Sequence, residues 1–302
     1  YALFDYGDVG KVKVQQAFAT FACEPRYVTN YGSARNRISI LSEAASFQPF
    51  RLRVDSTRVF VRACLEYMAK NAKRVVALTE AADRRAIGMG AGLQASELGV
   101  RFDFDSRGVE TIPLEVDRPE REINHMKAPT DYRTLSLPIY DRFKTTRTAA
   151  YPWAYVVPQR FVNAAALAQR HGIQVERLLV GSDVEALRFE PTKRDIAGSP
   201  FQGHRLQTLE GRFAKVSAHL EAGDFLVRTA QPLGPLAFAL FEPESVDGAL
   251  AWGFLGEPFD GGANYPVLKL THSSSFVTRI ATEFQVQTPQ SPALLGFFGK
   301  EE

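Results

Sequence analysis

The fold of the first part of the chain is decided by Thr29-Asn30-Tyr31-Gly32-Ser33-Ala34-Arg35-Asn36-Arg37-Ile38-Ser39-Ile40-Leu41-Ser42-Glu43-Ala44, followed by Phe47-Gln48-Pro49-Phe50. Residues 37–44 predict a strand, because isoleucine is frequent and alternate residues fall on opposite faces. Gly32 predicts a turn before this strand. Glu43 falls near the strand end, where a side chain can face a cleft instead of the core.

Two helices are expected after this stretch. Pro49 suits the first turn of a helix. Apolar residues then recur at helical spacing, at Phe50, Val54, Val61, Leu65, Met68 and Ala72, with Cys64 beside them. A second helical stretch, residues 75–87, ends at a glycine-rich cluster that begins at Gly88. The residues before these helices, 10–22, are ambiguous between strand and helix.

The character of the chain changes to mainly β from residue 100. A hairpin is expected over residues 100–116 with its turn at Ser106-Arg107-Gly108, then a loop over 117–131. The other predicted strands cover residues 132–146, 151–158, 173–180, 184–190, 203–212 and 224–229. Short helices are predicted over residues 161–171, closed by Gly172, and over residues 232–244.

Composition limits the classes of function. The chain has 302 residues, of which 45% are hydrophobic and 23% charged, as in ordinary globular proteins. A net charge of +2 without a basic block gives no case for nucleic acid. No apolar run approaches the roughly 20 residues that cross a bilayer, so no membrane span is expected. Two cysteines, Cys23 and Cys64, do not make a disulfide framework.

The opening stretch also gathers side chains that peptide hydrolysis requires. A carboxylate such as Glu43 can take a proton from an attacking water. Guanidinium groups such as those of Arg35 and Arg37 can bind an oxyanion or the terminal carboxylate of a peptide, and Tyr31 adds a hydroxyl group. A lone glutamate at a strand end is more commonly a solvated surface residue, so these residue types alone leave both interpretations open.

Residues 25–50 resemble the segment that carries the catalytic glutamate in bacterial zinc carboxypeptidases of the carboxypeptidase A type. The shared pattern is Pro25-Arg26, Thr29-Asn30-Tyr31, Arg35-Asn36-Arg37-Ile38 and Leu41-Ser42-Glu43-Ala44. The resemblance implies a peptide substrate, Glu43 as the general base, and Arg35, Arg37 and Tyr31 as substrate-binding residues. Relatives of this type are often exported, so it also implies export, while the residues themselves leave the compartment undetermined.

The resemblance implies zinc as the cofactor, yet the chain lacks the expected ligands. In that family a His-x-x-Glu pair and a further histidine hold the metal, all upstream of the glutamate segment. None of the five histidines starts such a pair; they are His125, His171, His204, His219 and His272. We therefore expect zinc in the intact protein, none bound by this chain alone, and a need for the upstream half. His204 is expected to be a structural residue in a turn.

Together these observations predict an α/β segment followed by largely β accessory domains with a few short helices. Residues 1–98 would form the end of a carboxypeptidase-like α/β/α domain, residues 99–150 a β-rich segment, and residues 151–302 a mixed, mainly β accessory domain. The expected function is part of a zinc metallocarboxypeptidase, inactive as this chain alone. The alternative is a non-catalytic scaffold that binds cell-wall glycan or a protein partner, with Tyr151, Trp153 and Tyr155 as a stacking surface or, more commonly, as half-buried core.

Overall fold

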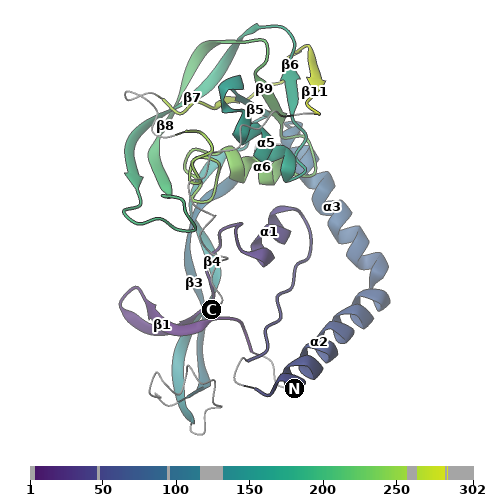
Figure 1. Cartoon of the computed structure of the whole chain (residues 1–302), viewed down its shortest axis with the longest axis vertical. Helices are drawn as coiled ribbons and strands as arrows, with labels where there is room; N and C mark the ends of the chain where they lie inside the picture. The colour runs from purple at the N-terminus through teal and green to yellow at the C-terminus, as the bar shows by residue number, and fades with distance from the viewer. Residues whose placement is uncertain are drawn as a thin grey trace, which may run out of the picture.

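The computed structural model describes residues 4–45, 48–93, 96–115, 132–256, 264–282 and 284, and it shows a mixed fold of helices and two sheets (Figure 1). The first sheet has the strand order β1-β2-β4-β3. Its strands are β1 (Asp8–Val12), β2 (Gln15–Ala19), β3 (Glu97–Glu115) and β4 (Tyr132–Ala150). Residues 10–22, left open between helix and strand, therefore contribute strands, and Lys13 adopts φ 58° in the turn between them.

A seven-stranded sheet organises the second half of the chain, with the order β11-β6-β9-β5-β10-β7-β8. Its strands are β5 (Ala154–Val157), β6 (Glu176–Leu178), β7 (Ser182–Ile196), β8 (Gln207–Leu220), β9 (Phe225–Arg228), β10 (Leu268–Leu270) and β11 (Thr278–Ile280). All of its paired neighbours run antiparallel. The predicted strands over 151–158 and 224–229 are confirmed, whereas only residues 176–178 of the stretch 173–180 are a strand.

The helices of the described residues are α1 (Val28–Ala34), α2 (Phe50–Lys70), α3 (Ala72–Gly90), η1 (Gln159–Phe161), α5 (Val162–Arg170) and α6 (Gly234–Phe241). Four of them, α2, α3, α5 and α6, form where the sequence predicts them, whereas α1 and η1 were not predicted. The turn predicted at Gly32 is wrong, because Gly32 lies within α1. Pro49 is the residue that precedes α2, with φ −52° and ψ 139°. Gly172 follows α5 with φ +84°, where its N–H bonds the carbonyl of Gln169, so it ends the helix as expected.

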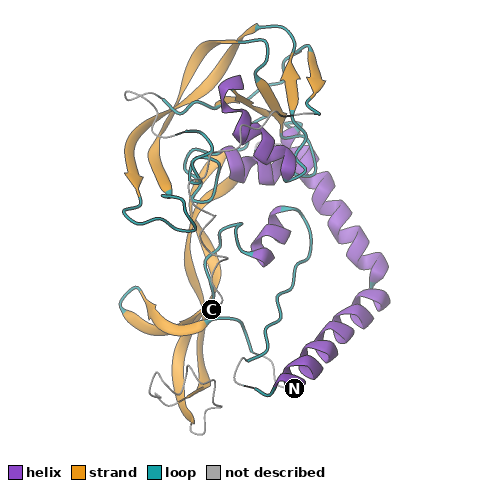
Figure 2. Cartoon of the chain, viewed as in Figure 1, coloured by secondary structure: helices purple, strands orange, loops and turns teal. Residues whose placement is uncertain are grey.

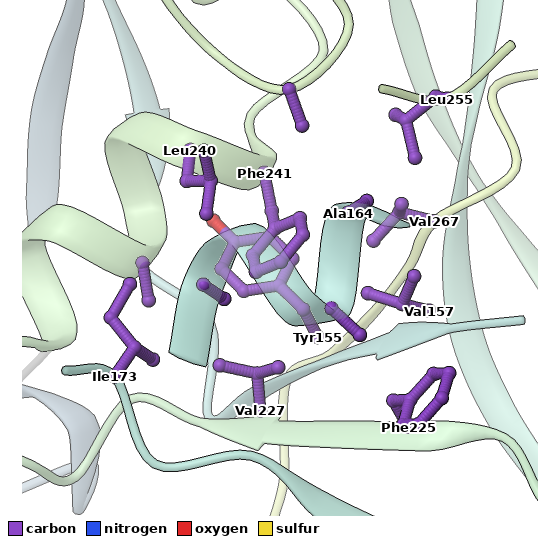
Figure 3. Packing of buried hydrophobic residues seen from close by; sticks show 14 of the residues in the cluster. Tyr155, Val157, Ala164, Ile173, Phe225, Val227, Leu240, Phe241, Leu255 and Val267 are labelled. Carbon is purple, nitrogen blue, oxygen red and sulfur yellow. The ribbon is translucent and has the colours of Figure 1, made fainter. Parts of the chain in front are cut away.

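The main core lies where α5 and α6 pack against one face of the seven-stranded sheet (Figure 3). Tyr155 and Val157 of β5 point into this core because alternate strand residues face opposite sides. Ala154 and Val156 belong to a second cluster on the other face. Residues 151–282 thus contain most of the buried side chains of the molecule.

A charged pair is buried inside this apolar core. Lys269 Nζ lies 2.6 Å from Glu242 Oε1, and the two side chains are 3% and 1% exposed. Tyr155 donates its hydroxyl hydrogen to the same Glu242 oxygen, and Lys269 donates to the Ala150 carbonyl at 2.9 Å. The pair therefore links strands β5 and β10, the end of α6 and the end of β4.

Two strand predictions are corrected by the structure. Residues 37–44 form no strand: Figure 2 shows this stretch as loop, and Ile38 and Ile40 are 58% and 57% exposed. A strand needs a neighbour for its backbone hydrogen bonds, and no described strand pairs with this stretch. The predicted hairpin around residues 106–108 is instead one continuous strand, β3, which carries irregularities in its pairing with β4. The loop predicted over 117–131 lies outside the described residues.

Helices α2 and α3 form an arm beside the rest of the molecule (Figure 1). No side chain of α2 is buried, and α3 buries only Ala86 and Gly90. The predicted apolar stripe of α2 is therefore present but uncovered, with Phe50 at 74% and Leu65 at 57% exposure. The sequence analysis predicted that this helix packs on a sheet. In the described part of the chain, no sheet face lies beside α2.

Candidate active site

Glu43 lies in the loop between α1 and α2, with an exposed side chain. Its carboxylate forms no hydrogen bond or ion pair with any other residue that the structure describes. A carboxylate in this setting is accessible to solvent and can accept a proton from water. The geometry is equally that of an ordinary surface glutamate, so the structure leaves the role predicted for Glu43 as a prediction.

Tyr31 and Arg35 are brought together by α1, four residues apart on one helical turn. The Arg35 Nη1 donates to the Tyr31 hydroxyl oxygen at 3.0 Å and also to the His171 carbonyl. The Tyr31 hydroxyl lies 2.8 Å from His171 Nδ1. These two residues predicted to bind substrate thus join α1 to the end of α5 in this structure.

The surroundings of the His171 imidazole disfavour its charged form. Burial and then the nearby Arg35 charge lower the pKa of His171. Arg35 can only donate hydrogen bonds, so the Tyr31 oxygen accepts from it, and the Tyr31 hydrogen remains available to donate to Nδ1. We therefore assign the imidazole proton to Nε2, on the basis of this hydrogen-bond network.

Arg37 faces a different partner, Asp83 on α3. Its guanidinium makes two parallel hydrogen bonds, Nη1 to Oδ1 at 3.0 Å and Nη2 to Oδ2 at 3.1 Å. This fork lowers the pKa of Asp83. Asn36 donates to the same carboxylate at 3.2 Å and to the Pro232 carbonyl at 2.8 Å, so this turn ties α3 to the segment before α6.

A cavity of about 230 Å³ opens beside Tyr31 and His171. Its walls are mainly apolar, and it lies between α1, α5, α6 and the residues after α6; the apolar residues include Leu167, Leu236, Leu240 and Phe254. Arg26 lies at its rim, 3.0 Å from Asp247 through Nε, with its guanidinium carbon 5.2 Å from the Trp252 ring centroid. Of the predicted site residues, Tyr31 lines this cavity, whereas Glu43 does not.

Sequence reasoning missed His171, Asp83 and Asp247 as partners of the opening stretch. Each is separated from its partner by 46 to 221 positions in the sequence. His171 was considered only as a possible zinc ligand, and the Arg-Asn-Arg run gives no indication of which acid it meets. From the positive charges of Arg35 and Arg37, one could predict only that each has an acidic or carbonyl partner.

The other residues considered for chemistry have structural surroundings. The turn containing His204 is closed by reciprocal backbone hydrogen bonds with Phe201 at 2.8 and 3.0 Å, and the His204 ring meets the Trp252 ring edge-on, which confirms the structural interpretation. Within the described ranges, no three His, Cys, Asp or Glu side chains are grouped to hold a metal ion. No described helix is long and apolar enough to cross a membrane.

Comparisons with known proteins indicate the class. The chain has a carboxypeptidase-like relationship, seen as weak similarity over 183 residues. The similar proteins are named Carboxypeptidase 2 and come from Trichophyton equinum, Trichophyton rubrum and Trichophyton tonsurans, each 29% identical to this chain. The match covers 58% of this chain and 32% of each relative, so it spans about a third of their length. No family model matches the chain. No solved structure matches it either.

Proposed function

We propose that this chain is part of a zinc-dependent carboxypeptidase, in which it supplies the general base Glu43 and residues near the substrate. The observation that carries the proposal is the 29% identity over 183 residues to proteins named Carboxypeptidase 2. The exposed carboxylate of Glu43, free of described partners, supports it, because a general base must reach its water.

The proposed substrate contacts fall into two groups. Arg37 keeps 52% of its side chain exposed despite its fork with Asp83, so its outer edge is open to a substrate carboxylate. Arg35 and Tyr31 are already bonded to His171, so they would act by holding α1 in place unless substrate displaces those bonds. We therefore rank Arg37 above Arg35 and Tyr31 as a direct contact.

The described residues do not fit zinc, since they include no group of three possible ligands. We assign the metal ligands to an upstream half of the protein, which the relatives' greater length supports. The uncovered apolar stripe of α2, including Val54 and Val61, supports the same assignment because it offers a surface on which such a body could pack. By resemblance, the protein would be exported.

Hydrolysis of a C-terminally blocked and an unblocked peptide tests the proposal, measured together with zinc content. We expect the natural full-length protein to release the C-terminal residue only from the unblocked peptide. Glu43→Gln should lower the rate by about 10² to 10⁴-fold with zinc content unchanged. Full activity in Glu43→Gln would refute the role of Glu43. Stoichiometric zinc in the 302-residue chain would refute the proposal that the zinc ligands lie in an upstream half.

The alternative, a glycan-binding scaffold, finds no support in its aromatic residues. Tyr155 is fully buried, and Tyr151 stacks on Phe238 with ring centroids 5.6 Å apart. Trp153 packs instead with Phe276 in the second cluster, under the Arg228 guanidinium. The three rings therefore do not form one exposed stacking surface, and the interpretation as core residues accounts for them.

A further inference from the structure

We propose that the cavity between α1, α5 and α6 binds a small carboxylate with an apolar body, the size of a single amino acid. The cavity volume is about 230 Å³, below the roughly 300–1,000 Å³ of pockets for drug-sized ligands. Its walls would take an aliphatic or aromatic group, since most of the lining side chains are apolar. The site requires neither a metal nor Glu43, so it stands or falls separately from the peptidase function.

The choice of a carboxylate follows from which polar groups around the cavity remain uncommitted. Asp247 accepts hydrogen bonds from the Arg26 backbone N–H at 2.6 Å and from Trp252 Nε1 at 2.8 Å, and its side chain is 3% exposed. Tyr31 accepts from Arg35 and, with the His171 tautomer assigned above, donates to His171 Nδ1. Asp247 and Tyr31 therefore each already accept from protein donors.

Two donors remain. Because His171 Nδ1 accepts from Tyr31, its Nε2–H is the ring's remaining polar group, and the imidazole lines the cavity. Arg26 forms an ion pair with Asp247 through Nε and donates from Nη2 to the Val246 carbonyl at 3.4 Å. Within the described part of the chain, its Nη1 has no hydrogen-bond partner, and its buried Nε makes only the ion pair. Two uncommitted donors at one cavity favour a ligand that accepts hydrogen bonds, and a carboxylate does so with charge assistance.

The position of Arg26 is fixed before any ligand arrives. Its guanidinium carbon lies 5.2 Å from the Trp252 ring centroid and 5.4 Å from that of Phe201, and Asp247 holds it from the side. A charge held in this way costs little reorganisation on binding, which favours affinity for a ligand of this small size.

Binding of 3-phenylpropionate to the 302-residue chain tests the proposal by calorimetry, with 3-phenylpropanamide as the neutral ligand of the same shape. We expect the acid to bind at least about tenfold more tightly than the amide, because one charge-assisted hydrogen bond is lost. Equal affinities, or no binding of the acid at millimolar concentration, would overturn the proposal.

Two variants locate the site. Ala239→Phe, which fills the cavity from α6, should abolish binding, while Ala81→Phe on the exposed face of α3 makes the same change elsewhere and should leave it intact. Tyr31→Phe keeps the ring but removes the hydroxyl group that fixes the His171 tautomer. We then expect ¹⁵N correlation spectra to show a mixture of the Nδ1–H and Nε2–H tautomers. The acid should bind more weakly. Undiminished binding in both Ala239→Phe and Tyr31→Phe would place the ligand elsewhere and refute the site.

Discussion

At the scale of single residues, the buried pair of Lys269 and Glu242 is the feature with the largest expected effect on stability. Burial raises the pKa of Glu242 and lowers that of Lys269, since both charged forms are removed from water. Their 2.6 Å contact and the hydroxyl of Tyr155 offset this cost. The pair is tolerated because each charge has its partner, which makes loss of one partner worse than loss of both.

Lys269→Met should therefore destabilise the chain by about 3–5 kcal/mol, because Glu242 is left buried without its cation. The double variant Lys269→Met with Glu242→Gln should recover part of this loss, since the amide is neutral and still accepts from Tyr155. Urea unfolding followed by tryptophan fluorescence measures both. A double variant no more stable than Lys269→Met alone would show that the charge is not the cause.

His171 carries a second prediction, on pH. Its pKa is lowered in the folded chain, so the unfolded chain binds more protons near and below the ordinary value of about 6.5. Its contribution to stability is thus present above that pH and is lost as the pH falls through it. We expect the fall in urea midpoint from pH 8 to pH 5 to be smaller in His171→Gln than in the parent chain; an equal fall would assign the pH effect to other groups.

At the scale of elements, the end of α3 depends on close backbone contact. A Cβ at Gly90 would lie 2.2 Å from the Ala230 nitrogen and the Thr229 carbonyl carbon, beyond the end of β9. Backbone at that distance cannot yield without displacing the helix. Gly88, two residues earlier on the same helix, would bring its Cβ only to 3.6 Å from a Leu93 methyl group.

These two glycines should respond in opposite directions to the same change. Gly88→Ala should stabilise the chain by about 0.5–1 kcal/mol through helix propensity, while Gly90→Ala should destabilise it by about 1–3 kcal/mol through overpacking. Thermal unfolding by circular dichroism compares them directly. If Gly90→Ala also stabilises, α3 does not dock on residues 229–230 as the structure has it.

Local patterns predicted the longer helices, although they missed α1. The apolar spacing of α2, the glycine after α5 and the cluster of apolar residues in α6 all act within one helix, so the sequence was sufficient for them. The stretch around Ile38 and Ile40 has strand-like composition, yet a strand forms only beside another strand. The turn expected at residues 106–108 became part of the 19-residue strand β3, because pairing with β4 on both sides of it outweighs the local turn propensity.

The candidate site was predictable only as a set of residue types. The sequence named Arg35 and Tyr31 as candidate binding residues, but it predicted neither α1 nor the contact that one helical turn gives them. It could not indicate His171, because a hydrogen bond across 140 positions depends on how α1 and α5 pack. The donor-rich character of the neighbouring cavity likewise depends on Asp247 being consumed by Arg26, which no local pattern encodes.

At the scale of the whole molecule, apolar surface is distributed unevenly. Residues 151–282 bury most of the core, while α2 leaves its apolar stripe exposed. An apolar stripe opposite a charged side is typical of a helix that packs against other protein along one face. Helices α2 and α3 carry nine Lys and Arg against four Asp and Glu, so two copies of this arm would repel each other and a covering body with acidic side chains fits better.

If another part of the protein covers the apolar stripe of α2, a charge placed in the stripe should affect the full-length protein differently from the 302-residue chain. Val61→Glu changes a 48% exposed residue of the apolar stripe, and Ala69→Glu makes the same charge change on the polar side of α2. In the 302-residue chain both should alter the free energy of unfolding by less than about 0.5 kcal/mol, and Val61→Glu should reduce self-association in light scattering.

In the natural full-length protein, Val61→Glu alone should cost about 2–4 kcal/mol, because a carboxylate would be buried against the covering body. Equal effects of the two variants there would mean that the stripe remains uncovered, and the upstream body would have to contact this chain through another surface.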